Sequence, residues 1–111
     1  MERAPLQVEV SAAKPGARIL KLKGPLVLGN FFQFQAELRK EETQLTVIDL
    51  AEVPYMDSTG MGELVNYYVH CQRIGSRIAI IGTNDRIMDL FKITRVDTIL
   101  PFVPTLEEAL N

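Results

Sequence analysis

A short segment after Leu50 collects the residues of this sequence best suited to chemistry or binding. Its core reads Asp57-Ser58-Thr59-Gly60-Met61-Gly62. A carboxylate, two hydroxyls and two glycines therefore stand where the pattern predicts a helix start. The unpaired N–H groups and the positive dipole end of a helix favour an anion there by roughly 0.3 to 1 kcal/mol. The glycines leave the backbone unshielded, so a protein partner or a kinase active site could approach this segment closely.

The same residues also suit an ordinary helix start. Asp, Ser and Thr are preferred N-cap residues, and glycines ease tight turns. On residue types alone, capping is the simpler interpretation of the segment. A binding or regulatory role needs support from elsewhere in the sequence.

Other candidate residues form no catalytic constellation. None of the residues one helical turn from His70 is a nucleophile, so His70 is predicted to be a surface histidine. Cys71 falls on an apolar stripe and is predicted to be a small core residue. Asp49 is expected to cap a loop or turn rather than to pair with Glu52 as acid and base. Nucleotide-binding glycine motifs, a G-x-S-x-G motif and zinc-ligand spacing are absent, so we expect no enzyme activity, cofactor or metal.

Length and composition restrict the class of protein further. The 111 residues predict one domain spanning 1–111, and 47% apolar with 23% charged residues is typical of a globular chain. The net charge of −2 and the absence of a Lys/Arg cluster argue against nucleic acid as a partner. The longest apolar run, residues 78–81, is far below the roughly 20 residues of a membrane span. One cysteine cannot form an intrachain disulfide, so we expect a cytoplasmic protein without membrane association.

The first part of the chain predicts a hairpin followed by a helix. Apolar and polar residues alternate from Leu6 to Val10 and from Arg18 to Lys23, as in strands with one buried face, and Pro15-Gly16 predicts the turn between them. Asn30 is a good N-cap, with Gln33 at the capping-box position, for a helix over about Phe31 to Glu41. The apolar stripe of that helix is expected to comprise Phe31, Phe34 and Leu38, widened by Phe32 and Ala36.

The middle of the chain predicts a strand, a loop and a second helix. Leu45–Leu50 is nearly continuously apolar and rich in β-branched residues, which favours an interior parallel strand covered on both faces. Gly75 is suited to end the following helix in a left-handed conformation. The apolar residues at helical spacing in that helix are Met61, Leu64, Val65, Tyr68 and Cys71.

The last part predicts alternating strands and short helices. Arg77–Gly82 is a second buried strand, and residues 83–85 offer N-caps to a short helix. Thr98–Phe102 predicts a short last strand at an edge, because it contains a proline. Thr105 begins a T-x-x-E capping box for a C-terminal helix.

The resulting order is β-β-α-β-α-β-α-β-α, which predicts an α/β fold with right-handed crossovers and a mostly parallel sheet. In such sheets the functional surface lies beyond the carboxyl ends of the strands. This rule again points to the segment after Leu50.

Three segments together resemble a known family. These are Val47-Ile48-Asp49-Leu50, the run from Met56 to Val65, and the stretch from Gly75 to Ile80. With a D-S-[ST]-G-x-G core between a buried strand and a helix, the chain resembles the STAS domain family, specifically bacterial anti-sigma-factor antagonists. The likeness extends over nearly the whole chain. It implies a mixed sheet of four or five strands flanked by helices, in agreement with the predicted order.

The resemblance implies a switch protein rather than an enzyme. In its unphosphorylated form, such a protein binds an anti-sigma factor that is also a serine kinase, and binding releases the sigma factor. Phosphorylation of the serine after the aspartate then ends binding, and a serine phosphatase is an expected further partner. That serine is Ser58 here, and Asp57, Thr59, Gly60, Met61 and Gly62 would complete the partner-binding surface. Thr59 offers a second hydroxyl, and the sequence alone leaves open which one is modified.

Two alternatives remain at this point. The chain could be a STAS scaffold, or the cytoplasmic subunit of a transporter without a phospho-switch. It could also be a small nucleotide-binding or hydrolytic protein that uses Asp57 and Ser58, although the motif lacks a base and a phosphate-binding lysine.

Overall fold

The computed structural model describes residues 5–111 of the chain. Four strands, four α-helices and one short 3₁₀ helix follow one another along these residues. Their order is β1 (Gln7–Lys14), β2 (Ala17–Lys23), α1 (Phe31–Lys40), β3 (Leu45–Glu52), α2 (Ser58–Ile74), β4 (Arg77–Ile81), α3 (Asp85–Ile93), η1 (Val96–Thr98) and α4 (Leu106–Leu110).

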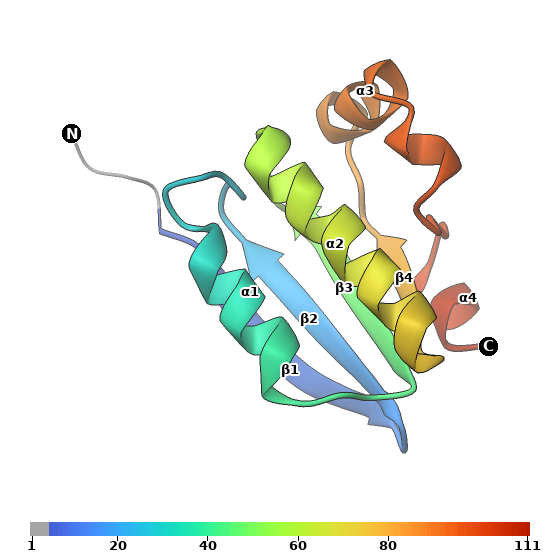
Figure 1. Ribbon diagram of the computed structural model, residues 1–111. Helices are drawn as coiled ribbons and strands as arrows, with labels where there is room; N and C mark the ends of the chain where they lie inside the picture. Colours follow the sequence, from blue (N-terminus) through green and yellow to red (C-terminus); the bar gives the residue numbers. More distant parts are fainter. Residues whose placement is uncertain (1–4) are drawn as a thin grey trace.

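The strands form one mixed sheet in the order β1-β2-β3-β4. β1 and β2 form the predicted antiparallel hairpin, whereas β2, β3 and β4 run parallel. Helices α1 and α2 lie side by side over one face of the sheet, and α3 lies beyond the end of β4 (Figure 1). The α/β fold and the mixed four-stranded sheet agree with the prediction.

The hydrophobic core lies mainly between the sheet and the α1–α2 pair. Phe34 of α1, Ile48 of β3 and Leu64 of α2 meet there and are fully buried. A smaller cluster on the opposite face joins Val47 and Ile81 to α4. β3 is therefore covered on both faces, as its continuous apolar pattern predicts. Across residues 5–111, no helix combines the length and apolarity that a membrane crossing requires.

Several predicted turn and cap residues take their expected conformations. Gly75 ends α2 with φ of 77°, and the Asn84 side chain accepts a hydrogen bond from the Ile87 amide at the start of α3. Thr105 caps α4 by accepting from the Glu108 amide at 3.1 Å. These local signals define where the helices begin and end because each one satisfies an otherwise unpaired backbone group.

The predicted last strand is reduced to a 3₁₀ turn and a single bridge between Phe102 and Ile80. The Ile80 amide donates to the Pro101 carbonyl, and the Val103 amide donates to the Ile80 carbonyl, both at 3.0 Å. Extending this parallel register would require an N–H from residue 101 for the Ile78 carbonyl. Because residue 101 is proline, it has no N–H to donate.

Asn30 occupies the N-cap position of α1, as predicted, but two other expectations for this helix, a capping side chain and a wide buried stripe, are wrong. The Asn30 side chain makes no N-cap hydrogen bond to the helix; instead it accepts from the Val27 amide at 3.0 Å and donates to the Pro25 carbonyl at 2.7 Å. Phe32 and Ala36 are exposed rather than part of the buried stripe. Because the stripe is narrower than predicted, α1 contributes mainly Phe34 and Leu38 to the buried core.

The buried face of α2 is rotated from the predicted one. Leu64 and Cys71 are buried as expected, but Met61 and Tyr68 are only partly buried. The other residues of α2 that lie fully inside are Gly60, Glu63 and Tyr67. In this orientation the first turn of α2 packs against the loop before α1, where Gly60 meets Leu26, and this contact shapes the candidate site.

Candidate functional site

Asp57 joins the start of α2 to the loop that precedes α1. One carboxylate oxygen, Oδ1, accepts from the Gly60 amide at 3.0 Å and caps the helix. The other, Oδ2, accepts from the Leu28 amide at 3.0 Å. The Asp57 amide in turn donates to the Leu26 carbonyl at 3.3 Å. Both carboxylate oxygens therefore hold backbone, and the negative charge lies at the positive end of the helix dipole.

Gly60 and Gly62 have different structural roles. A Cβ atom on Gly60 would lie 2.4 Å from the Leu26 carbonyl oxygen, so only glycine allows α2 to pack this closely against the loop. A Cβ on Gly62 would meet no atom within 4 Å. The fold therefore explains Gly60, whereas Gly62 leaves open backbone at the surface of the first turns of α2.

Ser58 is the first residue of α2 and is exposed to solvent. Thr59 is half-buried beside it. Met61 is also half-buried, and its sulfur lies 3.2 Å from the Thr94 hydroxyl at the end of α3. The structure thus gathers the predicted residues at one helix start, with the Ser58 hydroxyl the more accessible of the two.

The loop between β3 and α2 is also fastened to α3. The amide group of Asn84 donates to the Val53 carbonyl at 3.0 Å while the same side chain caps α3. The Arg86 guanidinium lies over the Tyr55 ring, 5.2 Å from its centroid.

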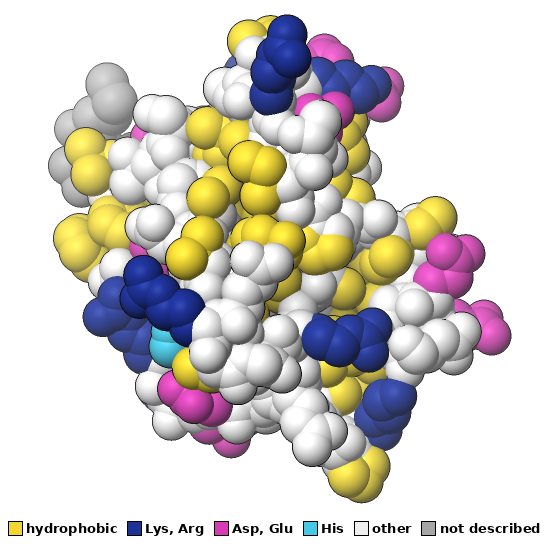
Figure 2. All heavy atoms as spheres, turned by 45° about the vertical axis from the view of Figure 1, so that its right-hand side comes forward, with side chains coloured by type: hydrophobic (Ala, Val, Ile, Leu, Met, Phe, Trp, Pro, Cys, Tyr) yellow, Lys and Arg dark blue, Asp and Glu magenta, His cyan; other side chains and the backbone are white. Residues whose placement is uncertain are grey.

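On one side of the molecule, hydrophobic side chains gather across the middle and upper part of the surface, and charged side chains lie mainly along the margins (Figure 2).

A buried polar cluster lies at the other end of the α1–α2 layer, near the amino ends of β2 and β3. Arg18 is 3% exposed. Its guanidinium donates to the Glu37 and Leu38 carbonyls at the end of α1, and to the Thr46 and Tyr67 hydroxyls, at 2.9 to 3.1 Å. Sequence reasoning missed this cluster. The signal was present, since strand alternation places residue 18 on the same face as Leu20 and Leu22.

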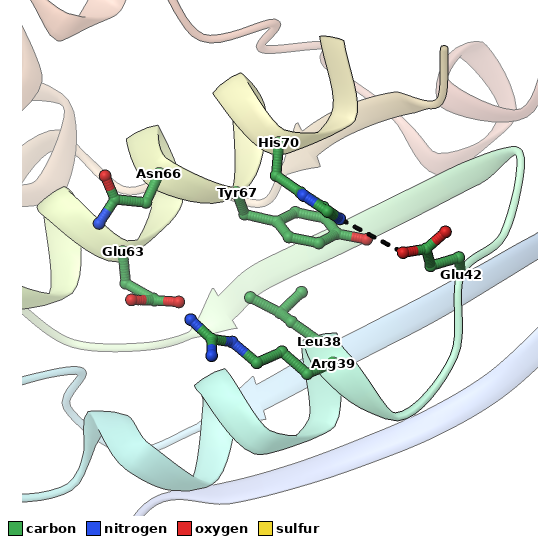
Figure 3. A pocket seen from close by; sticks show the side chains of 7 residues that line it. All are labelled: Leu38, Arg39, Glu42, Glu63, Asn66, Tyr67 and His70. Carbon is green, nitrogen blue, oxygen red and sulfur yellow. Dashed lines mark ion pairs between the residues drawn. The ribbon is translucent and has the colours of Figure 1, made fainter. Parts of the chain in front are cut away.

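A groove of about 360 Å³ lies between α1 and α2. Arg39 and Glu63 point toward one another from the facing helices, and His70 pairs with Glu42 at 3.5 Å (Figure 3). The Glu63 carboxylate accepts a hydrogen bond from the side-chain amide of Gln35 at 3.2 Å. Charged side chains of the two helices thus face one another across the groove, and His70 is a partly exposed residue beside the Glu42 carboxylate.

The remaining candidate residues have structural surroundings. Asp49 accepts from the Ala51 amide at 2.9 Å, but both residues lie within β3, where the pairing with β2 is irregular, so the prediction that Asp49 caps a loop or turn is wrong. Cys71 is buried, as predicted, and burial raises the pKa of its thiol. Within residues 5–111, no three His, Cys, Asp or Glu side chains are grouped so that they could hold a metal ion.

Residues 10–109 match the family model described as "STAS domain". The chain belongs to the STAS domain family. The motif from Asp57 to Gly62 and the whole α1–α2 layer fall within the matched region.

A curated STAS relative is named anti-sigma-B factor antagonist and comes from Listeria monocytogenes. It is 42% identical over 53 residues, which are 48% of this chain and 46% of that relative. The match therefore spans about half the length of the curated relative.

Solved structures share the fold over a greater length. SpoIIAA, an anti-sigma factor antagonist from Bacillus, covers 94% of this chain with 93% of its own in the unphosphorylated form, at 15% identity and a TM-score of 0.76. Its phosphorylated form has also been solved and gives a TM-score of 0.72. A sulfate transporter family protein from Wolinella succinogenes covers 90% of this chain with 86% of its own, at 20% identity and a TM-score of 0.72. At these identities the likeness establishes the fold.

Proposed function

We propose that this chain is an anti-sigma-factor antagonist controlled by phosphorylation of Ser58. The unphosphorylated form binds an anti-sigma factor that is also a serine kinase, and this binding releases the sigma factor. Phosphorylation of Ser58 ends the interaction, and a serine phosphatase restores it. The name of the Listeria relative and the two forms of SpoIIAA support this role.

The observation that carries the proposal is the position of Ser58. It is the exposed first residue of α2, directly after a capping aspartate whose two oxygens already hold backbone amides. A kinase can reach the hydroxyl without unfolding the domain. The half-buried position of Thr59 supports Ser58 as the acceptor of the two hydroxyls.

The same geometry explains how a phosphate could act as a local switch. A phosphate adds about −1.5 to −2 charge, which the start of a helix tolerates because its dipole and free N–H groups favour an anion. The folded domain is therefore expected to keep its structure. At an interface, the phosphate must be desolvated next to the charge of Asp57, and such repulsion costs several kcal/mol.

The proposal assigns complementary roles to the rest of the motif. Asp57 and Gly60 hold the first turn of α2 against the neighbouring loop, while Thr59, Met61 and Gly62 complete the partner-binding surface. As a regulator this chain needs no catalytic activity of its own and works as a single domain in the cytoplasm.

Phosphorylation by a candidate kinase tests the proposal. Each anti-sigma factor encoded in the same genome is purified and incubated with this protein and ATP, and the products are mapped by mass spectrometry. We expect one phosphate on Ser58, its absence from Ser58→Ala, and its retention in Thr59→Ala. Phosphate on Thr59 alone, or on neither residue with any of these kinases, contradicts the assignment.

The likeness to the Wolinella protein favours one second candidate, a STAS module that serves a transporter. Purification from native cells separates the two. Recovery in a stable membrane complex, without phosphate on Ser58, favours the transporter role, whereas recovery with an anti-sigma factor favours the antagonist role.

A further inference from the structure

Two large apolar side chains stand exposed next to the proposed phosphorylation site. Leu28 is 63% exposed and Phe32 is 64% exposed, although leucine and phenylalanine are commonly buried. The Leu28 amide donates to the Asp57 carboxylate, which places Leu28 beside the residue that precedes Ser58. Leu28 therefore lies next to the proposed Ser58 surface.

The loop that carries Leu28 is held firmly. The preceding Leu26 is fully buried, bridges to Met56, and packs its carbonyl against Gly60. The Asn30 side chain fastens the Val27 amide and the Pro25 carbonyl. Leu28 thus projects from a loop braced on both sides, so its backbone is already ordered before any partner binds.

Phe32 is supported in a similar way. The Phe31 amide donates to the Val27 carbonyl at 2.9 Å, which is the spacing of a helical turn. This bond closes one turn of chain over residues 27–31, so Leu28 and Phe32 flank the start of α1 with only three residues between them. The Phe31 ring packs against the core, and the Phe32 ring lies 4.2 Å from it.

We propose that Leu28 and Phe32 form an apolar anchor that inserts into a hydrophobic pocket of the anti-sigma factor, next to the surface that contacts Ser58. This inference rests on the proposed function and adds a second recognition element to it. An ordered apolar anchor gains affinity because little conformational entropy is lost on binding. The anchor supplies affinity that is insensitive to salt, whereas the charge of a phosphate on Ser58 switches the complex off.

Binding measurements with three variants test the anchor. The probe is the anti-sigma factor from the same genome that phosphorylates the wild-type chain, and affinity is measured by calorimetry. Leu28→Ser and Phe32→Ser should each weaken binding at least about tenfold, the effect of losing one well-buried apolar side chain. Because both side chains are exposed, the midpoint of urea unfolding should not change. Ile74→Ser is the matched control, since Ile74 is 41% exposed at the opposite end of α2 and should bind like wild type.

The outcomes separate the anchor from the switch. If Leu28→Ser and Phe32→Ser bind within about twofold of wild type while Ser58→Asp loses binding, the anchor is wrong and the proposed function stands. An equal loss in Ile74→Ser also overturns the anchor, because the effect would not be local. If the wild-type chain binds none of the anti-sigma factors, the proposed function fails and the anchor fails with it.

Discussion

The two ends of the α1–α2 layer use polar side chains in opposite ways. At the amino ends of β2 and β3, Arg18 is buried and directs its donors inward to hydroxyls and to the last carbonyls of α1. Beyond the carboxyl end of β3, both carboxylate oxygens of Asp57 also bond to backbone amides, but Ser58 beside it remains exposed. The first end serves stability, whereas the second presents an exposed hydroxyl at the surface, where open α/β sheets place function.

Removal of the Arg18 side chain gives the largest expected loss of stability. Arg18→Ala removes four hydrogen bonds, to the buried hydroxyls of Thr46 and Tyr67 and to two helix carbonyls, and leaves the two hydroxyls with each other and Thr43 as side-chain partners. The free energy of unfolding, measured in urea, should fall by about 3 kcal/mol. The folded fraction should still bind its partner normally. A change below about 1 kcal/mol would mean that the cluster does not stabilise this end of the layer.

A negative charge at position 58 should have the reverse effect, a loss of binding without a loss of stability. Ser58→Asp is expected to weaken binding to the anti-sigma factor about a hundredfold, which corresponds to about 3 kcal/mol. Its free energy of unfolding should stay within about 0.5 kcal/mol of wild type, because Ser58 is exposed. Ser58→Ala is the control: it should bind the anti-sigma factor and should keep binding after incubation with the kinase and ATP. Normal binding by Ser58→Asp would show that charge at this position does not govern the complex.

The two glycines of the motif show the same contrast between a structural position and an open surface position within one helix, α2. Gly60→Ala should destabilise the fold by about 2 kcal/mol, since its Cβ would collide with the Leu26 carbonyl. Gly62→Ala should stabilise it by up to about 1 kcal/mol, because its Cβ meets open space within a helix. Thermal unfolding of the pair measures both. If Gly62→Ala is more stable and yet binds the anti-sigma factor weakly, the partner requires bare backbone there.

The smallest expected effect concerns Cys71, which lies in the core close to the Arg18 cluster. Burial raises the pKa of its thiol, so the folded state holds the thiol proton more tightly than the unfolded state. This contribution to stability is complete below the unfolded pKa of about 8.5 and is lost as the pH rises through the raised value. Native protein should react slowly with a thiol reagent at pH 8 because the thiol is buried. Arg18→Ala should react faster because its lower stability exposes the thiol more often. Rapid labelling of the folded wild type would contradict this description of the core.

Local signals in the sequence predicted more of the Ser58 end than of the Arg18 end. A capping residue, two hydroxyls and glycine before an apolar repeat define a helix start without reference to the rest of the chain. Strand alternation indicates that Arg18 faces the core, but its partners lie 19 to 49 positions away and no local pattern identifies them. Asn30 shows the same limit: it occupies the predicted N-cap position, but its side chain braces the loop before the helix instead of capping it.

The rotation of α2 has a similar cause. Several stripes along the helix satisfy the apolar spacing, and Tyr67 fits it as well as Tyr68 does. Tertiary contacts select between them: Gly60 must face Leu26, and the Tyr67 hydroxyl must reach Arg18. The reduced last strand, in contrast, follows from one residue: Pro101 predicts an edge strand, and it lacks the N–H that the ladder would need to extend toward Ile78.

The hydrogen bond between Leu28 and Asp57 joins residues 29 positions apart in sequence. The surroundings of Ser58 therefore exist only after β2, β3 and both covering helices have assembled. A peptide spanning residues 53–65 contains the whole motif but lacks this neighbour. An enzyme that reads the assembled surface rather than the linear motif would leave nascent and misfolded copies unmodified, so the modification would report on correctly folded molecules alone.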